Sequence, residues 1–190
     1  MHMSNGSFLT NQLLIAMPSL ADPNFSQTVT LVCEHTERGA LGIVLNRPMT
    51  MRLGEVLDQL SLPSHDPRLA DQAILRGGPV QTDRGFVLHR PTGREWDSTL
   101  EVSDTLHVTT SRDVLESLAQ GDGPFEAAMA LGYAGWEAGQ LEDEMLHNSW
   151  LTVPCDDSIV FEVPFEQRWH AAARLLGVDL SRISHVSGHA

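Results

Sequence analysis

The chain has 190 residues, of which 42% are hydrophobic and 19% charged, and its 25 acidic and 12 basic residues give a formal net charge of −13. This length suits one domain with a substantial core, and the sequence has no run of about 20 apolar residues that would span a bilayer. All basic residues are arginines scattered along the chain. We therefore expect no direct binding to nucleic acid and none to membranes, because both need clustered positive charge.

The N-terminus and the cysteines favour a cytoplasmic protein. The first 20 residues lack the basic stretch and the cleavage site of a signal peptide. Cys33 and Cys155 lie far apart and form no C-x-x-C pair, which argues against a secreted disulfide framework. The absence of lysine excludes Schiff-base chemistry, and the histidines show no metal-ligand spacing. We expect no cofactor and no metal.

Apolar patterns predict strands and one helix in the first third of the chain. A short apolar run, which reads as a strand, stops at Pro18. Two runs rich in β-branched residues, 25–35 and 40–46, are joined by four residues that end in Gly39, as in a β-hairpin. Apolar residues then recur at i, i+3, i+4 and i+7 within 52–60, which indicates one face of a short helix.

Further strands are expected at 73–80, 85–90 and within 100–110. Ser111 is expected to cap a helix that ends at Gly121.

The segment 124–136 is ambiguous, because its alanines favour a helix while alternating apolar residues from Phe125 onward favour a strand. The final predicted helix, 164–177, carries Trp169 and Leu176 on its apolar stripe.

Several motifs together resemble the AlgH/YqgE family of bacterial proteins. In chain order they are "GSFLTNQLLIAMPSLADPNFSQTVTLVCEH", "GALGIVLNRP", "RGGPV", "GYAGWEAGQLEDE", "NSWL" and "PFEQRWHAAARLLG". The resemblance covers nearly the whole chain. It implies a strand before "GYAGW" and a largely uncharacterised family with a regulatory, transcription-associated role for some members.

Strict βαβ alternation is absent, so we predict an α+β fold with a single compact domain over residues 1–180. Its central β-sheet is expected to be irregular and largely antiparallel, with short flanking helices. Residues 181–190 are expected to form a loose C-terminal tail.

Candidate binding residues fall in motifs rich in glycine, proline and aromatic residues. Arg47 is suited to bind an anion, and Gly77 and Gly78 are suited to expose backbone N–H groups to a ligand. In both motifs a purely structural turn is the simpler alternative. The candidates for ligand or partner binding are Asn46, Arg47, Pro48, Arg76, Gly77, Gly78, Pro79, Gly132, Tyr133, Gly135, Trp136 and Asn148.

"GYAGW" is predicted to be a strand-to-helix corner whose glycines are required by backbone geometry. One aromatic, with Trp136 as the candidate, is expected to remain partly exposed as an anchor for a partner or ligand. The alternative is that both aromatics fill the core, and Trp150 is expected to pack there. The carboxylates of 142–144 are expected to form a solvated helix face, because neighbouring helical side chains diverge by about 100°.

These features favour a non-catalytic binding or regulatory module that acts through a protein partner or a small ligand. No catalytic residue is assigned, because the sequence lacks a G-x-S-x-G elbow and an H-E-x-x-H pair. The alternative is an enzyme of unknown reaction, with a small-ligand cleft formed by the NRP, RGGP and GYAGW motifs. Convergence of these motifs on one pocket would favour the ligand site or the enzyme.

Overall fold

A computed structural model describes residues 8–124 and 126–187. Its strands are β1 (Gln12–Ala16), β2 (Val29–Thr36), β3 (Gly39–Val44), β4 (Pro48–Arg52), β5 (Ala73–Arg76), β6 (Val80–His89), β7 (Thr99–Glu101), β8 (His107–Thr109), β9 (Ala127–Glu137) and β10 (Trp150–Pro154). Its helices are α1 (Leu53–Gln59), α2 (Pro67–Ala70), α3 (Arg112–Gln120), α4 (Gln140–Leu146), α5 (Asp157–Phe161), the 3-10 turn η2 (Phe165–Gln167), α6 (Arg168–Arg174) and α7 (Leu180–Ser187). The predicted hairpin is confirmed as β2 and β3.

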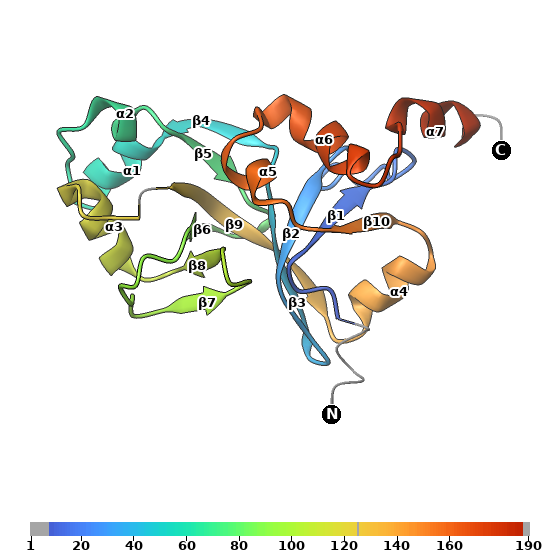
Figure 1. Cartoon of the computed structure of the whole chain (residues 1–190), viewed down its shortest axis with the longest axis horizontal. Coiled ribbons are helices and arrows are strands. Elements are labelled where there is room, and N and C mark those ends of the chain that lie inside the picture. Colours follow the sequence, from blue (N-terminus) through green and yellow to red (C-terminus); the bar gives the residue numbers. More distant parts are fainter. Residues whose placement is uncertain (1–7, 125, 188–190) are drawn as a thin grey trace.

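The strands form one sheet in the order β10-β1-β2-β3-β9-β6-β8-β7, with β4 and β5 attached beside this path. The long strand β9 links two halves of the molecule (Figure 1). Its first part pairs antiparallel with β6 and parallel with β5, whereas its last part pairs antiparallel with β3. The predicted α+β class with a largely antiparallel, irregular sheet is confirmed, and the ambiguous segment before "GYAGW" is a strand.

Three apolar clusters make up the core of the described residues. The largest packs β1, β2 and β3 against α5 and α6, and a second lies around α1 and α3. The third surrounds Trp136 and Trp150 under α4. The helices α1 to α3 gather on one half of the molecule, while α4 to α7 lie on the other (Figure 1). The second cluster forms the base of a cavity between α1 and α3.

The last predicted helix is shorter than expected. It divides into η2 and α6, and Leu176 lies beyond α6 and is 40% exposed, so its placement on the apolar stripe was wrong. Arg168, which has no carboxylate partner among the described residues, is buried and donates from Nη1 to the Leu45 carbonyl (2.8 Å) and from Nε to the Val163 carbonyl (2.7 Å). Burial lowers the pKa of Arg168 to about 10. These bonds fix α6 beside the end of β3.

The C-terminal segment begins in a helix where the sequence suggested a loose tail. Helix α7 continues to Ser187, while residues 188–190 lie outside the described residues. Phe125, which contributed to the predicted alternation, also lies outside them. Among the described residues every helix is too short or too polar to cross a membrane.

Candidate functional site

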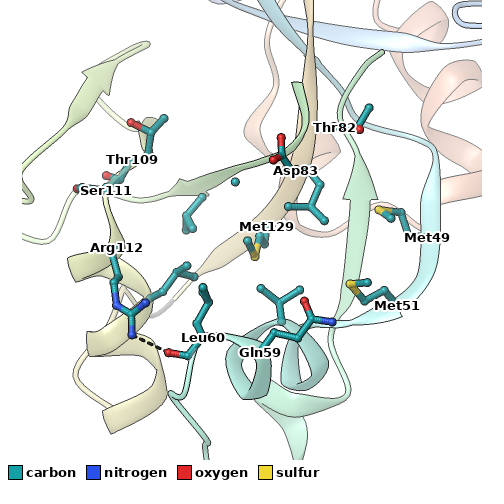
Figure 2. Close-up of a pocket in the computed structure, with 16 residues that line it drawn as sticks. Met49, Met51, Gln59, Leu60, Thr82, Asp83, Thr109, Ser111, Arg112 and Met129 are labelled. Carbon is teal, nitrogen blue, oxygen red and sulfur yellow. Dashed lines mark hydrogen bonds between the residues drawn. The ribbon is translucent and has the colours of Figure 1, made fainter. Parts of the chain in front are cut away.

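A cavity of about 490 Å³ opens in the half of the molecule that contains α1 and α3 (Figure 2). Side chains from β6 and β9 form its floor, β4 and α1 supply one wall, and α3 with the end of β8 supplies the other. Most of its interior is apolar, including Val56, Val87, Leu115 and Leu131. None of the binding residues predicted from the sequence lines this cavity.

Three of the seven methionines line this cavity, which we call the methionine pocket. Met49 and Met51 alternate with exposed residues along β4 and are half-buried, whereas Met129 on β9 is buried. Both side chains from β4 extend toward Met129 (Figure 2). Methionine is flexible and polarizable, so such a lining adapts to apolar groups of different shape. Gly85 on the floor leaves room for the Met129 side chain. A Cβ at position 85 would lie 2.9 Å from the Met129 Cε, which is closer than normal van der Waals contact.

Polar side chains surround the mouth of the pocket. Arg112 on α3 donates from Nη2 to the Leu60 carbonyl (2.6 Å) and from Nε to Glu116 (3.3 Å), so it ties α3 to the end of α1 (Figure 2). Asp83 on β6 is exposed and has no ion-pair or hydrogen-bond partner among the described residues. An apolar interior with a few polar groups at the mouth is typical of small-molecule sites.

A buried hydrogen-bond chain supports one wall of the pocket. The Thr109 Oγ1, which is completely buried, lies 2.7 Å from His89 Nε2 and 2.8 Å from Thr99 Oγ1. His89 Nδ1 lies 2.9 Å from the Arg90 carbonyl, which can only accept, so Nδ1 carries the proton and Nε2 accepts from Thr109. Burial lowers the pKa of His89, although the bond to Arg90 opposes this shift. His89 is therefore a neutral structural residue.

This arrangement predicts a loss of stability in mild acid. Because the pKa of His89 is lower in the folded than in the unfolded chain, the unfolded state takes up the proton first as the pH falls below about 6.5. The free energy of unfolding should therefore decrease from pH 7 to pH 5.5 in urea titrations, and His89→Gln should flatten this slope. His65→Gln, at an exposed histidine, serves as the control. An unchanged slope in His89→Gln would contradict the assignment.

The NRP motif closes the loop that precedes β2. Asn46 Oδ1 accepts from the Val29 N–H (3.1 Å), and its Nδ2 donates to the Gln27 carbonyl (2.9 Å). Arg47 donates to three further carbonyls, those of Pro23 and Asn24 through Nη1 and that of Ser26 through Nη2, at 2.7–2.9 Å. Pro48 begins β4. Asn46 and Arg47 thus make the local hydrogen bonds of the structural alternative.

The two glycine motifs meet backbone to backbone. A Cβ on Gly77 would lie 2.4 Å from the Gly132 carbonyl oxygen, and a Cβ on Gly132 would lie 2.5 Å from the Gly78 carbonyl oxygen. Gly132 also has φ of +80°, a conformation that glycine adopts without steric cost. These glycines therefore allow the β5–β6 connection to cross β9.

"GYAGW" lies inside β9, so its assignment to a strand-to-helix corner was wrong. The turn into α4 comes later, at Gly139 with φ of +79°. The prediction that backbone geometry requires its glycines holds for Gly132 but not for Gly135, whose φ is not positive and whose added Cβ would lie 3.4 Å from the nearest atom, on the Tyr133 ring. Tyr133 is half-buried and packs edge-on against Phe86.

Trp136 is buried, with 6% of its surface exposed, so the exposed-anchor hypothesis was wrong for this residue. Its indole N–H donates to Glu144 Oε1 (3.0 Å), and the N–H of the buried Trp150 donates to the same oxygen (2.9 Å). A buried indole usually finds such a partner. The alternative, in which both aromatics of "GYAGW" fill the core, therefore holds for Trp136, whereas Tyr133 is half-buried. Trp150 packs in the core as expected.

The acidic residues of α4 are not all solvated. Glu144 binds both indoles, and Glu142 Oε1 lies 3.1 Å from Nε2 of the buried His35. Burial alone would raise the pKa of Glu142, but hydrogen bonds from its own backbone and from His35 lower it. Of the three, Asp143 is the solvated one. Asn148 follows the helix with φ of +58°, which asparagine tolerates at a helix C-terminus.

Glu144→Ala is expected to lower the free energy of unfolding by about 2 kcal/mol or more, because it leaves two buried indole N–H groups without an acceptor. Asp143→Ala on the same helix should change it by less than about 0.5 kcal/mol. Urea denaturation followed by tryptophan fluorescence measures both. Equal effects of the two substitutions would show that the bonds to Glu144 contribute nothing specific.

The three candidate motifs do not converge on one cavity. Arg47, Arg76, Gly78 and Pro79 line a small cavity of about 50 Å³. Tyr133, Gly135 and Trp136 instead line a depression of about 480 Å³ beside the β2–β3 hairpin. The structure thus brings NRP and RGGP together, while "GYAGW" faces elsewhere. Among the described residues, no three histidine, cysteine or acidic side chains converge on a metal position.

Comparison with known proteins gives the family. A family model described as AlgH-like matches residues 13–181. The chain belongs to the AlgH-like family. A UPF0301 protein of Thioalkalivibrio sulfidiphilus is 55% identical over 188 residues, covering 99% of this chain and 100% of the relative.

Two solved structures are similar to this AlgH-like chain. The solution structure of the AlgH protein from Pseudomonas aeruginosa has a TM-score of 0.79 at 52% identity, covering 97% of each chain. The crystal structure of a Corynebacterium diphtheriae protein has a TM-score of 0.74 at 21% identity, covering 93% of this chain and 91% of the other, and shows a shared fold alone.

The pocket residues that were not among the candidates predicted from the sequence include Met49, Met51, Asp83, Arg112 and Met129. One signal was present in the sequence, because "MTM" directly after the NRP motif places two methionines on the same face of a strand. Nothing local links them to Asp83, Arg112 or Met129, which come from three other elements.

Proposed function

We propose that this AlgH-like protein is a non-catalytic binding module that takes a small ligand with an apolar body in the methionine pocket. Its regulatory role follows from ligand occupancy and not from direct contact with DNA, which its net charge of −13 disfavours. We place its action in the cytoplasm. The observation that carries the proposal is the cavity of about 490 Å³ with three methionines inside and charged groups at its mouth.

The size and lining of the pocket support this proposal. Small-ligand sites in proteins span roughly 300–1,000 Å³ and combine an apolar lining with a few polar groups that set orientation. Here Asp83 and Arg112 supply charges of opposite sign at the mouth, and Arg112 is held in place by Leu60 and Glu116. A ligand with an apolar body and a polar end would fit both features.

The chemistry of the lining favours binding over catalysis. The described residues around the pocket include a serine, Ser111, but no histidine or cysteine. The Ser111 hydroxyl accepts from the Ser98 N–H and donates to Asp113. Burial alone would raise the pKa of Asp113, but hydrogen bonds from Ser111 and from the Asp97 N–H lower it, so this carboxylate is a weak base for activating the serine as a nucleophile. An enzyme built on the NRP, RGGP and GYAGW motifs is less well supported, because "GYAGW" lines a different cavity from the other two motifs.

The test is a thermal-shift screen of small apolar and amphiphilic compounds. Compounds that stabilise the wild-type protein should lose their effect in Gly85→Leu, because a leucine on the floor fills the pocket. Gly135→Leu is the matched control, since this strand glycine also lacks a positive φ and lies outside the pocket. The proposal fails if every stabilising compound acts equally on both variants.

A further inference from the structure

We propose that Arg47 and Arg76 form a second binding site, which takes a single phosphoryl or carboxylate group. The two side chains line the same small cavity together with Asn24, Gly78 and Pro79, and its volume of about 50 Å³ suits one such group. The described residues that line this cavity include no aspartate and no glutamate. This site is independent of the methionine pocket.

Arg47 is held rigidly on one side of the cavity. Three carbonyl groups of the preceding loop accept hydrogen bonds from its Nη1 and Nη2 atoms, so little conformational entropy remains to be lost on binding. Among the described residues, these bonds leave the Nε–H and one N–H of Nη2 available to a ligand. Burial lowers the pKa of Arg47, Asp22 opposes this, and the positive charge of Arg76 lowers it further.

Arg76 completes the site from β5. Its backbone N–H donates to the Arg47 carbonyl (2.8 Å), which fixes the two residues side by side. Its side chain is exposed and has no hydrogen-bond or ion-pair partner among the described residues. The two neighbouring guanidinium groups repel each other, Asp22 offsets part of this repulsion, and an anion between the two groups would relieve it further.

The donors around the cavity favour an oxyanion. The side-chain amide of Asn24 has no hydrogen-bond partner among the described residues and adds two N–H donors to those of the arginines. Guanidinium forks bind phosphoryl and carboxylate oxygens in bidentate fashion. Because Arg76 is exposed and the cavity holds only one group, the remainder of a larger ligand would lie outside, on the protein surface.

An NMR titration tests this site. Inorganic phosphate and acetate are added separately to the full chain at constant ionic strength, and backbone amide shifts are followed. We expect saturable shifts at Val44, Gly77 and Gly78 with at least one of the two anions. Arg76→Gln should weaken this binding about tenfold or more, because it removes a charge-assisted interaction.

Two controls make the result decisive. Arg68→Gln replaces another exposed arginine whose side chain has no partner among the described residues, and it should leave the anion affinity unchanged. Arg76→Lys keeps the charge but not the fork, so its affinity should be intermediate. Because neither the Arg76 nor the Arg68 side chain makes a hydrogen bond or ion pair among the described residues, none of the three variants should unfold at a lower urea concentration than the wild type. The proposal is overturned if neither anion produces saturable shifts at these amides, or if Arg76→Gln binds as tightly as Arg68→Gln.

Discussion

Gly132→Ala is expected to lower the free energy of unfolding by more than about 3 kcal/mol. Alanine at this position would adopt a left-handed conformation with φ of +80°, which is costly for a residue with a Cβ atom. The same Cβ would also lie 2.5 Å from the Gly78 carbonyl oxygen, and neither backbone can move without breaking the contact between β9 and the β5–β6 connection. Urea denaturation measures the loss directly.

Gly135→Ala is the matched control, three residues along the same strand. Its φ is not positive and the nearest neighbour of the new Cβ is the edge of the Tyr133 ring at 3.4 Å, so the stability should change by less than about 1 kcal/mol. If both substitutions are tolerated equally, the close approach of the two glycine motifs is not a requirement of the fold.

Trp169→Ala should lower the free energy of unfolding by about 3–5 kcal/mol, the range for large-to-small changes in a core. The indole is 8% exposed and packs in the largest apolar cluster. Its N–H donates to the Ala16 carbonyl (3.0 Å), so the substitution also removes a buried hydrogen bond between α6 and β1. The denaturant midpoint should fall accordingly.

Leu176→Ala provides the comparison for Trp169. This leucine follows the same helix and is 40% exposed, so its loss should cost less than about 1 kcal/mol. An unchanged midpoint for Trp169→Ala would show that α6 does not secure the sheet in the way the buried indole indicates.

Local patterns predicted the elements whose signals are local. The hairpin of β2 and β3 follows from two β-branched runs and a short turn, and α3 ends at Gly121 with φ of +86° as expected for a glycine C-cap. The strand at 127–137 was different, because its composition allowed a helix and the resemblance to a known family decided it. Alanine-rich β9 is a strand because it pairs with β3, β5 and β6.

The site depended on contacts that no local pattern contains. Gly132 and Gly135 look equivalent in the sequence, yet only the first meets another backbone closely. The burial of Trp136 depends on α4 folding back so that Glu144 reaches its indole. The methionine pocket combines residues from β4, α1, β6, α3 and β9, and their distance along the chain explains why sequence reasoning missed them.

The central claim is that the methionine pocket is the ligand site, and the methionines themselves report on it. In a methyl-labelled sample, a compound selected by its thermal stabilisation should shift the signals of Met49, Met51 and Met129 together. Met17 and Met145, which do not line this pocket, should keep their positions. If the selected compounds instead shift Met145 or Met17 and leave the three pocket methionines unchanged, the ligand binds elsewhere and the proposed function is wrong.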